Sequence, residues 1–373
     1  MRPRTLRTAL ATLTAGLAAT GCLTAAAPAT AGPSTVAAGP STAGPSTSAV
    51  GPAAVVGPAA AQGRPPADAC SPAVSLTGFT DALDKTTYDG AYVGNLSALA
   101  PDRRGSLAAL SDRSSLFRLD ARTLKPQGVV TLADESGAAL DSEGLVTDLP
   151  HSRLRSSGGT PTGTYLVSSE TEPSVRRYSR TGELLGRLPV PDDLRTAPEG
   201  RGRANGSFEG LTLLPGGRTL LASMEYPLDG DPADLVRIQS WQRTRHGDFR
   251  LGAQYTYRTD PGLGISEVTA TPDGRLLVLE RGFTAGVGNT VRLQLADRPG
   301  RGTVLHKRLL ADLADCPALG ATAKQPQPNP LLDNFEGMAV TGRSGGRLEV
   351  LVVSDDNQNA VQTTRFLRLR VRA

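Results

Sequence analysis

Several residue types on which enzyme and binding sites often depend are scarce in this chain. Its 373 residues include three histidines, three cysteines and one tryptophan, and only 4% are aromatic. Neither a Gly-x-Ser-x-Gly nor a His-Glu-x-x-His motif occurs, and there is no phosphate-binding glycine loop. A Ser-His-acid triad therefore has little support. The shortage of aromatic residues also argues against the stacking platforms that bind single-stranded nucleic acid.

Strong charge and long apolar runs are absent as well. The formal net charge is +4, and the first seven residues alone carry three arginines, so the rest of the chain is close to neutral. Such a chain indicates no polyanionic partner, and we expect it to bind no nucleic acid. Beyond residue 70, no apolar run is long enough to span a membrane.

The first 31 residues have the organisation of an export signal. Three arginines precede the apolar run 10–19, which is too short and too rich in Ala and Thr for a membrane-spanning helix. Residues 29–31 (Ala-Thr-Ala) suit ordinary signal peptidase, while residues 19–22 (Ala-Thr-Gly-Cys) resemble a bacterial lipoprotein box that would make Cys22 an acylated first residue. We therefore expect the protein to be secreted, or attached to the cell envelope by a lipid anchor on Cys22.

The rest of the chain divides into a linker and a domain. Residues 32–69 consist mostly of Ala, Gly, Pro, Ser and Thr, which cannot form an apolar core and indicate a disordered tether. Residues 70–373 are expected to form one globular domain. After Cys22 only Cys70 and Cys316 remain, and two thiols in an oxidising compartment usually pair, so we expect a disulfide between them.

A short segment recurs five times in the domain and predicts a ring of similar sheets. Each copy combines a turn, a polar residue and an apolar pair, and the marker residues are Ser97, Glu143, Glu209, Glu267 and Glu336. A unit that begins with one short strand cannot bury its apolar face alone, so it must stack on its neighbours. The predicted fold class is all-β, a β-propeller of about five four-stranded blades, with six as the alternative.

Short alternating runs between Pro/Gly turns mark the strands. The clearest runs are 163–168, 219–224, 275–279, 291–295, 348–354 and 366–371. In the fourth repeat, a complete blade is predicted from residues 268–270, 276–279, 291–295 and 306–311. The last repeat has too few strands before the C-terminus, so residues 74–79 are expected to supply its outer strand and to close the ring.

If the first strand of each blade lines the central channel, the marker residues converge near one rim. Carboxylates about 7 Å apart repel by roughly 2 kcal/mol per pair at an effective dielectric constant near 20. A bound cation, arginine partners, backbone N–H donors or raised pKa values could offset this repulsion. Calcium, which takes several carboxylate oxygens, suits the first option. The alternative is that each acid accepts backbone N–H bonds and holds neighbouring blades in register.

A second set of polar residues ends the next strand of every repeat. Its members are Asp112 with Arg113, Glu170, Glu225, Glu280 with Arg281, and Asp355-Asp356-Asn357. These strand ends are expected in the loops on one face, where propellers bind ligands. Acids beside Arg and Asn could hold a divalent cation and an anionic oxygen together. The alternative for each of them is a solvated loop residue.

The order of these segments resembles the phytase-like propeller family described as esterase-like activity of phytase. The resemblance rests on Phe208-Glu209-Gly210-Leu211, on residues 276–281, and on residues 334–338 followed by Asp355-Asp356-Asn357. It implies an exported β-propeller that hydrolyses phosphate or carboxylate esters. Similarity to calcium-dependent phytases implies a metal-binding role for Glu209, Glu225, Glu280, Glu336 and Asp355. The chain departs from the family pattern at Val268, where Gly is expected, and at Ser97-Ala98, where the acid is missing.

The leading hypothesis is a metal-assisted phosphoester hydrolase, acting as a monomer on a small anionic or ester substrate. The expected cofactor is Ca²⁺, and the candidate ligands are Glu143, Glu209, Glu225, Glu267, Glu336 and Asp355. The candidate catalytic residues are Glu209, Glu280 and Arg281, with Arg281 or Arg113 stabilising developing charge. The competing hypothesis is a non-catalytic propeller of the cell envelope that binds a protein, a glycan or a small anion. A serine esterase is a third hypothesis, for which the sequence marks no nucleophile.

Overall fold

The structure is a computed structural model that describes residues 67–103, 105–149, 163–300 and 302–373, all within the unit Gly63–Ala373. The predicted export signal, Cys22 and almost all of the linker 32–69 lie outside the described residues. Within these residues the chain is nearly all β, with two short 3-10 turns, η1 (Asp192–Leu194) and η2 (Leu313–Asp315), and no α-helix. The predicted all-β class is confirmed.

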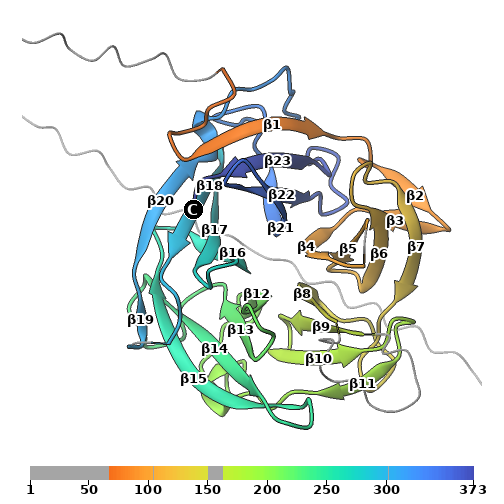
Figure 1. Ribbon diagram of the computed structural model, residues 1–373, viewed down its shortest axis with the longest axis vertical. Helices are drawn as coiled ribbons and strands as arrows, with labels where there is room; N and C mark the ends of the chain where they lie inside the picture. Colours follow the sequence, from red (N-terminus) through yellow and green to blue (C-terminus); the bar gives the residue numbers. More distant parts are fainter. Residues whose placement is uncertain (1–66, 104, 150–162, 301) are drawn as a thin grey trace, which may run out of the picture. The chain divides into compact units, whose positions relative to one another are not determined.

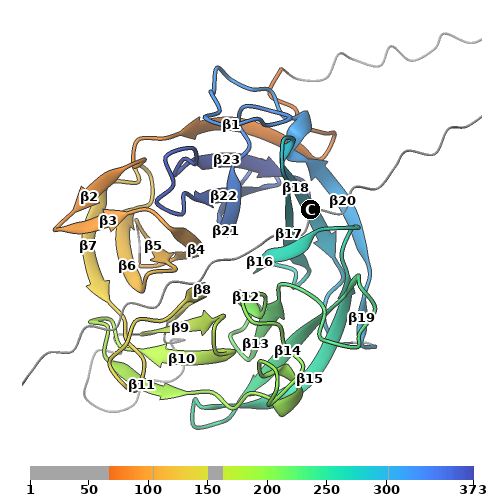
Figure 2. The same cartoon turned by 180° about the vertical axis from the view of Figure 1, so that it is seen from behind.

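Five antiparallel sheets, the blades, surround a common axis, as Figures 1 and 2 show from opposite sides. Blade 1 contains β4 (Leu96–Pro101), β5 (Ser106–Ser111), β6 (Ser115–Asp120) and β7 (Pro126–Thr131). Blade 2 contains β8 (Ser142–Asp148), β9 (Thr164–Ser169), β10 (Ser174–Tyr178) and β11 (Leu184–Arg187). Blade 3 contains β12 (Phe208–Leu213), β13 (Thr219–Met224), β14 (Leu235–Arg243) and β15 (Phe249–Arg258). Blade 4 contains β16 (Gly264–Ala270), β17 (Leu276–Thr284), β18 (Gly288–Ala296) and β20 (Lys307–Asp312).

Blade 5 takes its outer strand from the beginning of the domain. It contains β21 (Asn334–Ser344), β22 (Arg347–Asp355), β23 (Phe366–Val371) and β1 (Val74–Thr80). β1 pairs antiparallel with β23 and lies outside it in Figure 1. Of the remaining strands, β2 (Thr86–Tyr88) and β3 (Ala91–Val93) form a separate hairpin, and β19 (Val304–Leu305) adds in parallel to β15. The described residues therefore form five blades rather than six, and the predicted closure is confirmed.

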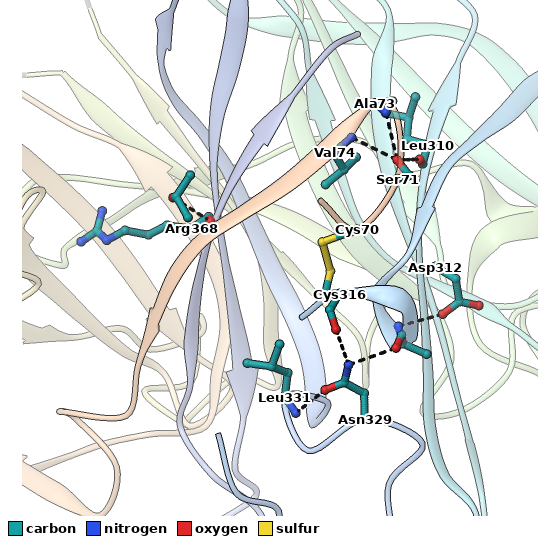
Figure 3. Close-up of a disulfide and its surroundings, with 12 residues drawn as sticks. Cys70, Ser71, Ala73, Val74, Leu310, Asp312, Cys316, Asn329, Leu331 and Arg368 are labelled. Atoms are coloured by element: carbon teal, nitrogen blue, oxygen red, sulfur yellow. Dashed lines mark hydrogen bonds between the residues drawn. A yellow bond between two sulfur atoms is a disulfide. The ribbon is translucent and has the colours of Figure 1, made fainter. Parts of the chain in front are cut away.

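A disulfide joins the segment just before β1 to the segment that follows η2. Cys70 and Cys316 are bonded to each other, as predicted from the cysteine count, and Figure 3 shows them with their neighbours. Ser71 Oγ donates a hydrogen bond to Leu310 O at 2.6 Å. Asn329 Nδ2 donates to Cys316 O at 2.7 Å. The disulfide and these hydrogen bonds attach the first strand of the domain to blade 4 and to the loop that leads into blade 5.

The strands lie close to the positions that the sequence predicted. The predicted runs 219–224 and 366–371 coincide with β13 and β23. Of the four runs predicted for one blade, three fall in β16, β17 and β18, and the fourth, 306–311, overlaps β20 with a shift of one residue. Between β12 and β13, Gly216 and Gly217 have φ values of +90° and +67°. Glycine adopts such values without strain, which is why this Pro-Gly-Gly turn can end one strand and begin the next.

Apolar side chains fill the spaces between neighbouring blades. All residues of β13 except the first are buried, because a blade packs against a neighbour on each of its faces. Trp241 of β14 is fully buried, its Nε1 donates to Pro189 O at 2.7 Å, and its ring meets Phe208 edge-on with centroids 6.0 Å apart. Aromatic side chains of this size contribute much of the packing energy of a core. This packing holds the inner strands at defined positions around the axis.

Candidate metal-binding and catalytic pocket

A small pocket lies where the five inner strands begin. β4, β8, β12, β16 and β21 lie nearest the axis in Figures 1 and 2. The pocket at their N-terminal ends, here called the acidic pocket, has a volume of about 290 Å³. Its lining residues are Ser97, Asp112, Asp141, Glu143, Glu170, Asn205, Glu209, Glu225, Tyr226, Arg281, Glu336, Asp355 and Asn357. A second hollow of about 190 Å³, among the later residues of the same strands, is lined by apolar and threonine side chains.

A β-bulge in each inner strand adds one residue at the level of the acidic pocket. In β21 the pairing shifts between Phe335 and Gly337, which leaves Glu336 as the extra residue. A bulge re-aims the side chain that it adds. The residues at this position in the five strands are Ser97, Glu143, Glu209, Ser266 and Glu336. Three of the predicted marker glutamates therefore line the acidic pocket together with Ser97.

The structure contradicts the position predicted for Glu267. In β16 the bulged residue is Ser266, and Glu267 takes the place that Gly337 holds in β21. Glu267 does not line the acidic pocket. Its Oε1 accepts backbone N–H bonds from Val268 at 2.8 Å and from Leu211 of blade 3 at 3.2 Å. Glu267 thus connects blades 3 and 4, and the absence of a glycine after it was the signal of the one-residue shift.

The second strand of each blade contributes one ionic side chain at its pocket end. Arg281 lies opposite Gly264 as Asp355 lies opposite Asn334. The residues at this position in blades 1 to 5 are Asp112, Glu170, Glu225, Arg281 and Asp355, and all five line the acidic pocket. Blade 4 therefore differs from the other blades at the strand end, where it has an arginine, while at the bulge it has a serine, as blade 1 does.

The structure also contradicts a pocket position for Glu280. Successive side chains of a strand point to opposite faces, so the side chain of Glu280 lies on the face of β17 opposite to that of Arg281. Its carboxylate is fully buried, accepts a hydrogen bond from Tyr257 Oη at 2.6 Å, and forms an ion pair with Lys307. Arg113 is exposed and does not line the pocket, and its Nε lies 3.6 Å from Asp112 Oδ1. Of the predicted catalytic residues, only Glu209 and Arg281 reach the pocket.

The Asp355-Asp356-Asn357 run is divided between two environments. Asp355 and Asn357 line the acidic pocket. Asp356 instead forms an ion pair with Lys85 and accepts the backbone N–H of Asn95 at 2.9 Å. Asp356 therefore connects the β2–β3 hairpin region to blade 5 and does not line the pocket.

The acidic pocket concentrates eight carboxyl groups beside one guanidinium group. Carboxylate oxygens of Asp141, Glu143 and Glu170 lie within 4.8 Å of one another, and so do those of Glu170, Glu209 and Glu225. Two unit charges at this separation repel by roughly 3 kcal/mol at an effective dielectric constant near 20. The pocket therefore requires either protons or a cation to be stable.

Burial and mutual repulsion raise the pKa values of these carboxyl groups. Burial, and then the charges of Glu225 and Asp141, raise the pKa of Glu170 to about 7. Burial also raises the pKa of Glu336 to about 7, although Arg281 opposes the rise. The pKa values of Glu143 and Glu209 are raised well above the usual range by burial and by neighbouring carboxylates. Without a cation, part of this cluster holds protons at neutral pH.

The donor atoms of the pocket suit a hard divalent cation. The two groups of three acids offer only carboxylate oxygens, and Glu170 belongs to both groups. Glu170 Oε1 and Asp112 Oδ1 are buried atoms for which the described residues supply no hydrogen-bond partner. Calcium takes several oxygen ligands and tolerates irregular geometry. The residues present therefore fit a calcium ion.

Arg281 is the single cationic side chain of the pocket lining. Its Nη2 lies 3.2 Å from Glu336 Oε1 and 3.6 Å from Glu225 Oε1. Burial alone would lower its pKa, but these two carboxylates raise the pKa above its ordinary value, so the group stays charged. Its Nε is buried and has no hydrogen-bond partner among the described residues. One side of the pocket can thus bind an anionic group.

Three lining residues were not identified from the sequence. Asp141 lies two residues before Glu143, where blade 5 has Asn334, so the repeat pattern did not mark it. Asn205 lies outside the repeated segment and has a φ of +53°, which suits a turn, yet it also lines the pocket. Tyr226 follows Glu225, and burial raises its pKa to about 12. A spacing of two acids around a serine, Asp141-Ser-Glu143, was the one available signal.

Fold and pocket together define a class of protein, a five-bladed β-propeller with an acid-lined pocket at the N-terminal ends of its inner strands. A family model described as phytase-like, esterase-like activity of phytase, matches residues 91–358. The chain belongs to this family. No curated protein matches the sequence significantly. Among the described residues, none forms a helix of the length and apolarity that crossing a membrane requires.

Proposed function

We propose that the protein hydrolyses esters, and phosphate esters in particular, at the acidic pocket with bound calcium. The observation that carries the proposal is the pair of carboxylate triplets that share Glu170, together with Arg281 Nε, for which the described residues supply no hydrogen-bond partner. A site that offers a hard cation and a fixed guanidinium group together suits a doubly charged phosphate better than a neutral group. Membership of the phytase-like family supports the same reaction class.

The two triplets assign the residues that would hold the ion. These are Asp141, Glu143, Glu170, Glu209 and Glu225. Bound calcium would supply positive charge that polarises a phosphoryl oxygen and lowers the pKa of a water ligand. Glu267 and Glu280 have no part in this, because their carboxylates are occupied by contacts between and within blades.

Arg281 would bind an anionic oxygen of the ester. Glu336 and Glu225 hold its guanidinium group at the pocket, so little side-chain entropy remains to be lost when the substrate binds. A preorganised cation of this kind stabilises charge that increases in the transition state. We therefore expect Arg281→Lys, which keeps the charge but loses the planar donor group, to lower kcat/KM by at least tenfold.

Metal analysis and hydrolysis assays on the mature protein test the proposal. We expect calcium to remain bound after dialysis, and turnover of glycerol phosphate to disappear with a chelator and to return with added Ca²⁺. Glu170→Gln should lose both calcium and turnover, by about 100-fold or more, while Glu183→Gln, the same change at an exposed turn, should lose neither. Turnover that continues in the presence of the chelator, or the absence of turnover with every ester tested, would overturn the proposal.

The non-catalytic envelope propeller is the second candidate. Glu267 and Glu280 favour it, because both show that buried acids in this fold can serve contacts alone. Calcium bound at the pocket with no turnover of phosphate or carboxylate esters would support this reading. Labelling by a covalent serine probe would instead revive the serine esterase hypothesis.

We also propose that the protein works outside the cytoplasm. The leader-like residues 1–31 and the Cys70–Cys316 disulfide support this location. The mass of the mature protein distinguishes the two modes of export. A chain that begins after Ala31 indicates free secretion, and a chain that begins with an acylated Cys22 indicates a lipid anchor. A mass that includes the intact leader would contradict both.

A further inference from the structure

A larger hollow lies on the outer side of blade 2, next to the acidic pocket. It has a volume of about 700 Å³, and we call it the blade 2 groove. Its walls are the turn residues Thr171, Glu172 and Pro173, residues 187–190 at the end of β11 and just after it, and the loop residues Arg195, Thr196 and Glu199. The acidic pocket, at about 290 Å³, is near the lower limit of sites that hold a whole small molecule. The part of a substrate beyond its phosphate group must therefore lie outside the acidic pocket.

Two segments of the chain contribute to the walls of both hollows, so the blade 2 groove is adjacent to the acidic pocket. The turn after β9 places Glu170 in the pocket and Thr171 in the groove. The loop before β12 places Thr196 in the groove and Asn205 in the pocket. Thr171 Oγ1 donates to Asp141 Oδ2 of the pocket wall at 2.9 Å. The turn after β9 is therefore the rim between the two spaces.

The blade 2 groove has no net charge, in contrast to the pocket. Two acids, Glu172 and Glu199, face two arginines, Arg187 and Arg195. Arg187 Nη2 lies 2.6 Å from Glu172 Oε1, so this pair neutralises itself. Arg195 Nη2 lies 3.1 Å from Asp192 Oδ1. The groove thus offers no surplus of positive charge for a second phosphate group.

Both apolar and polar side chains line the groove. Pro173, Leu188 and Val190 supply the apolar surface, and the hydroxyls of Thr171 and Thr196 stand among the lining residues. A flat apolar surface packs against the C–H face of a sugar or polyol ring, while hydroxyl and carboxylate groups bond its hydroxyls. A neutral hydroxylated group therefore complements the groove better than a charged one.

We propose that the blade 2 groove binds the alcohol part of the substrate, and that this part is a neutral sugar or polyol carrying a single phosphate. The inference rests on the proposed phosphoester hydrolysis at the acidic pocket. It excludes polyphosphorylated rings as preferred substrates, because their additional phosphates would meet the carboxylates of the pocket and an uncharged groove.

Three substrates separate this inference from the proposed function. Methyl phosphate has no group that reaches the groove, glucose 1-phosphate has a neutral ring, and inositol hexakisphosphate has a polyanionic one. With the mature protein and Ca²⁺, we expect kcat/KM for glucose 1-phosphate to exceed that for each of the other two by at least tenfold. Hydrolysis of all three at equal efficiency would overturn the groove inference and leave the proposed function standing. Failure to hydrolyse any of them would overturn the proposed function, and the groove inference with it.

Variants in the groove give the second test. Val190→Trp fills the groove beyond the acidic pocket and should raise KM for glucose 1-phosphate at least fivefold, with methyl phosphate unchanged. Val304→Trp, the same change at an exposed strand outside the groove, should change neither. Glu199→Lys gives the groove a positive charge and should raise kcat/KM for inositol hexakisphosphate severalfold at low salt. The inference is wrong if Val190→Trp, folded as judged by its melting temperature, affects both small substrates equally.

Discussion

Neighbouring residues on one strand have opposite roles in this protein. Arg281 faces the acidic pocket, whereas Glu280 faces Tyr257 and Lys307, because successive side chains of a strand point to opposite faces. A shift of one position has the same effect in β16, where Glu267 binds backbone N–H groups and Ser266 takes the bulge. The role of an acidic residue here therefore depends on which face of the strand its position directs the side chain to.

This difference predicts opposite effects of two equivalent substitutions. Glu170→Gln removes a charge from a crowded cluster and should stabilise the calcium-free protein by about 1–2 kcal/mol at pH 8. Glu267→Gln keeps one acceptor for the N–H groups of Val268 and Leu211 but buries a new donor, and should destabilise it by about 1–3 kcal/mol. Urea unfolding in the presence of a chelator measures both. Destabilisation by both substitutions would show that the pocket acids also serve as structural contacts.

Asp333 predicts a pH dependence that is separate from the pocket. Burial raises the pKa of its carboxyl group to about 6, although it accepts N–H bonds from Asn334 at 2.9 Å and from Thr363 at 3.0 Å. A carboxyl group whose pKa is raised on folding stabilises the protein while it is protonated. That stability is present below the unfolded pKa near 4 and is lost as the pH rises through 6.

The matched variant for this prediction is Asp333→Asn. Between pH 4 and 7, the free energy of unfolding of the native protein should fall relative to that of the variant, by on the order of 2–3 kcal/mol. The lost acceptor gives the variant a constant penalty, so only the slope with pH is informative. Parallel curves for the two proteins would contradict the raised pKa.

At the scale of the element, the bulge and the glycine after it allow the inner strands to approach one another. Gly144 N donates to Ser168 Oγ at 2.7 Å, and Ser168 Oγ donates to Glu209 O at 2.8 Å. A Cβ atom on Gly144 would overlap Glu209 O and lie 2.6 Å from the Cβ of Leu211. The glycine of the repeated segment is therefore required by the backbone of the next blade, not by a ligand.

Gly144→Ala should consequently destabilise the protein by about 2–4 kcal/mol and lower its melting temperature by several degrees. Gly78→Ala is the matched control, because a Cβ atom at Gly78 in β1 meets nothing within 4 Å. That control should be neutral or slightly stabilising. Equal melting temperatures for Gly144→Ala and the native protein would contradict the close approach of blades 2 and 3.

At the scale of the whole domain, stability depends on closing the ring between its two ends. β1 completes blade 5 by pairing with β23, and the Cys70–Cys316 disulfide spans a sequence separation of 246 residues. A closed ring leaves no blade without a neighbour on either face. It also holds in place the nine residues that line the acidic pocket from its two levels.

Removal of the disulfide should therefore weaken the domain without opening it. Cys70→Ser/Cys316→Ser should lower the free energy of unfolding by about 2–5 kcal/mol, because the unfolded chain gains freedom. Calcium binding and turnover should persist at 25 °C, since β1 still pairs with β23. An unchanged urea midpoint would mean that the bond contributes nothing, and loss of calcium would mean that it shapes the pocket directly.

The fold followed from the sequence because its signals are local and repeated. Turn residues, alternating apolar runs and five copies of one segment predicted five blades and the strand that closes them, and the cysteine count predicted the disulfide. The placement of Glu143, Glu209 and Glu336 in one pocket followed from the same repetition. Period and composition are properties that a sequence carries without reference to contacts.

Tertiary structure alone decided which polar residues share the pocket. In β16 the bulged residue is Ser266 and not Glu267, and the alternation of side chains along β17 points Glu280 away from the pocket. Loops from outside the repeat bring Asp141 and Asn205 to the pocket wall. The adjacency of the pocket and the blade 2 groove likewise depends on contacts between separate loops, such as the hydrogen bond from Thr171 to Asp141. A shift of one residue moves a side chain to the opposite face of its strand, and only the pairing of that strand with its neighbour determines this register.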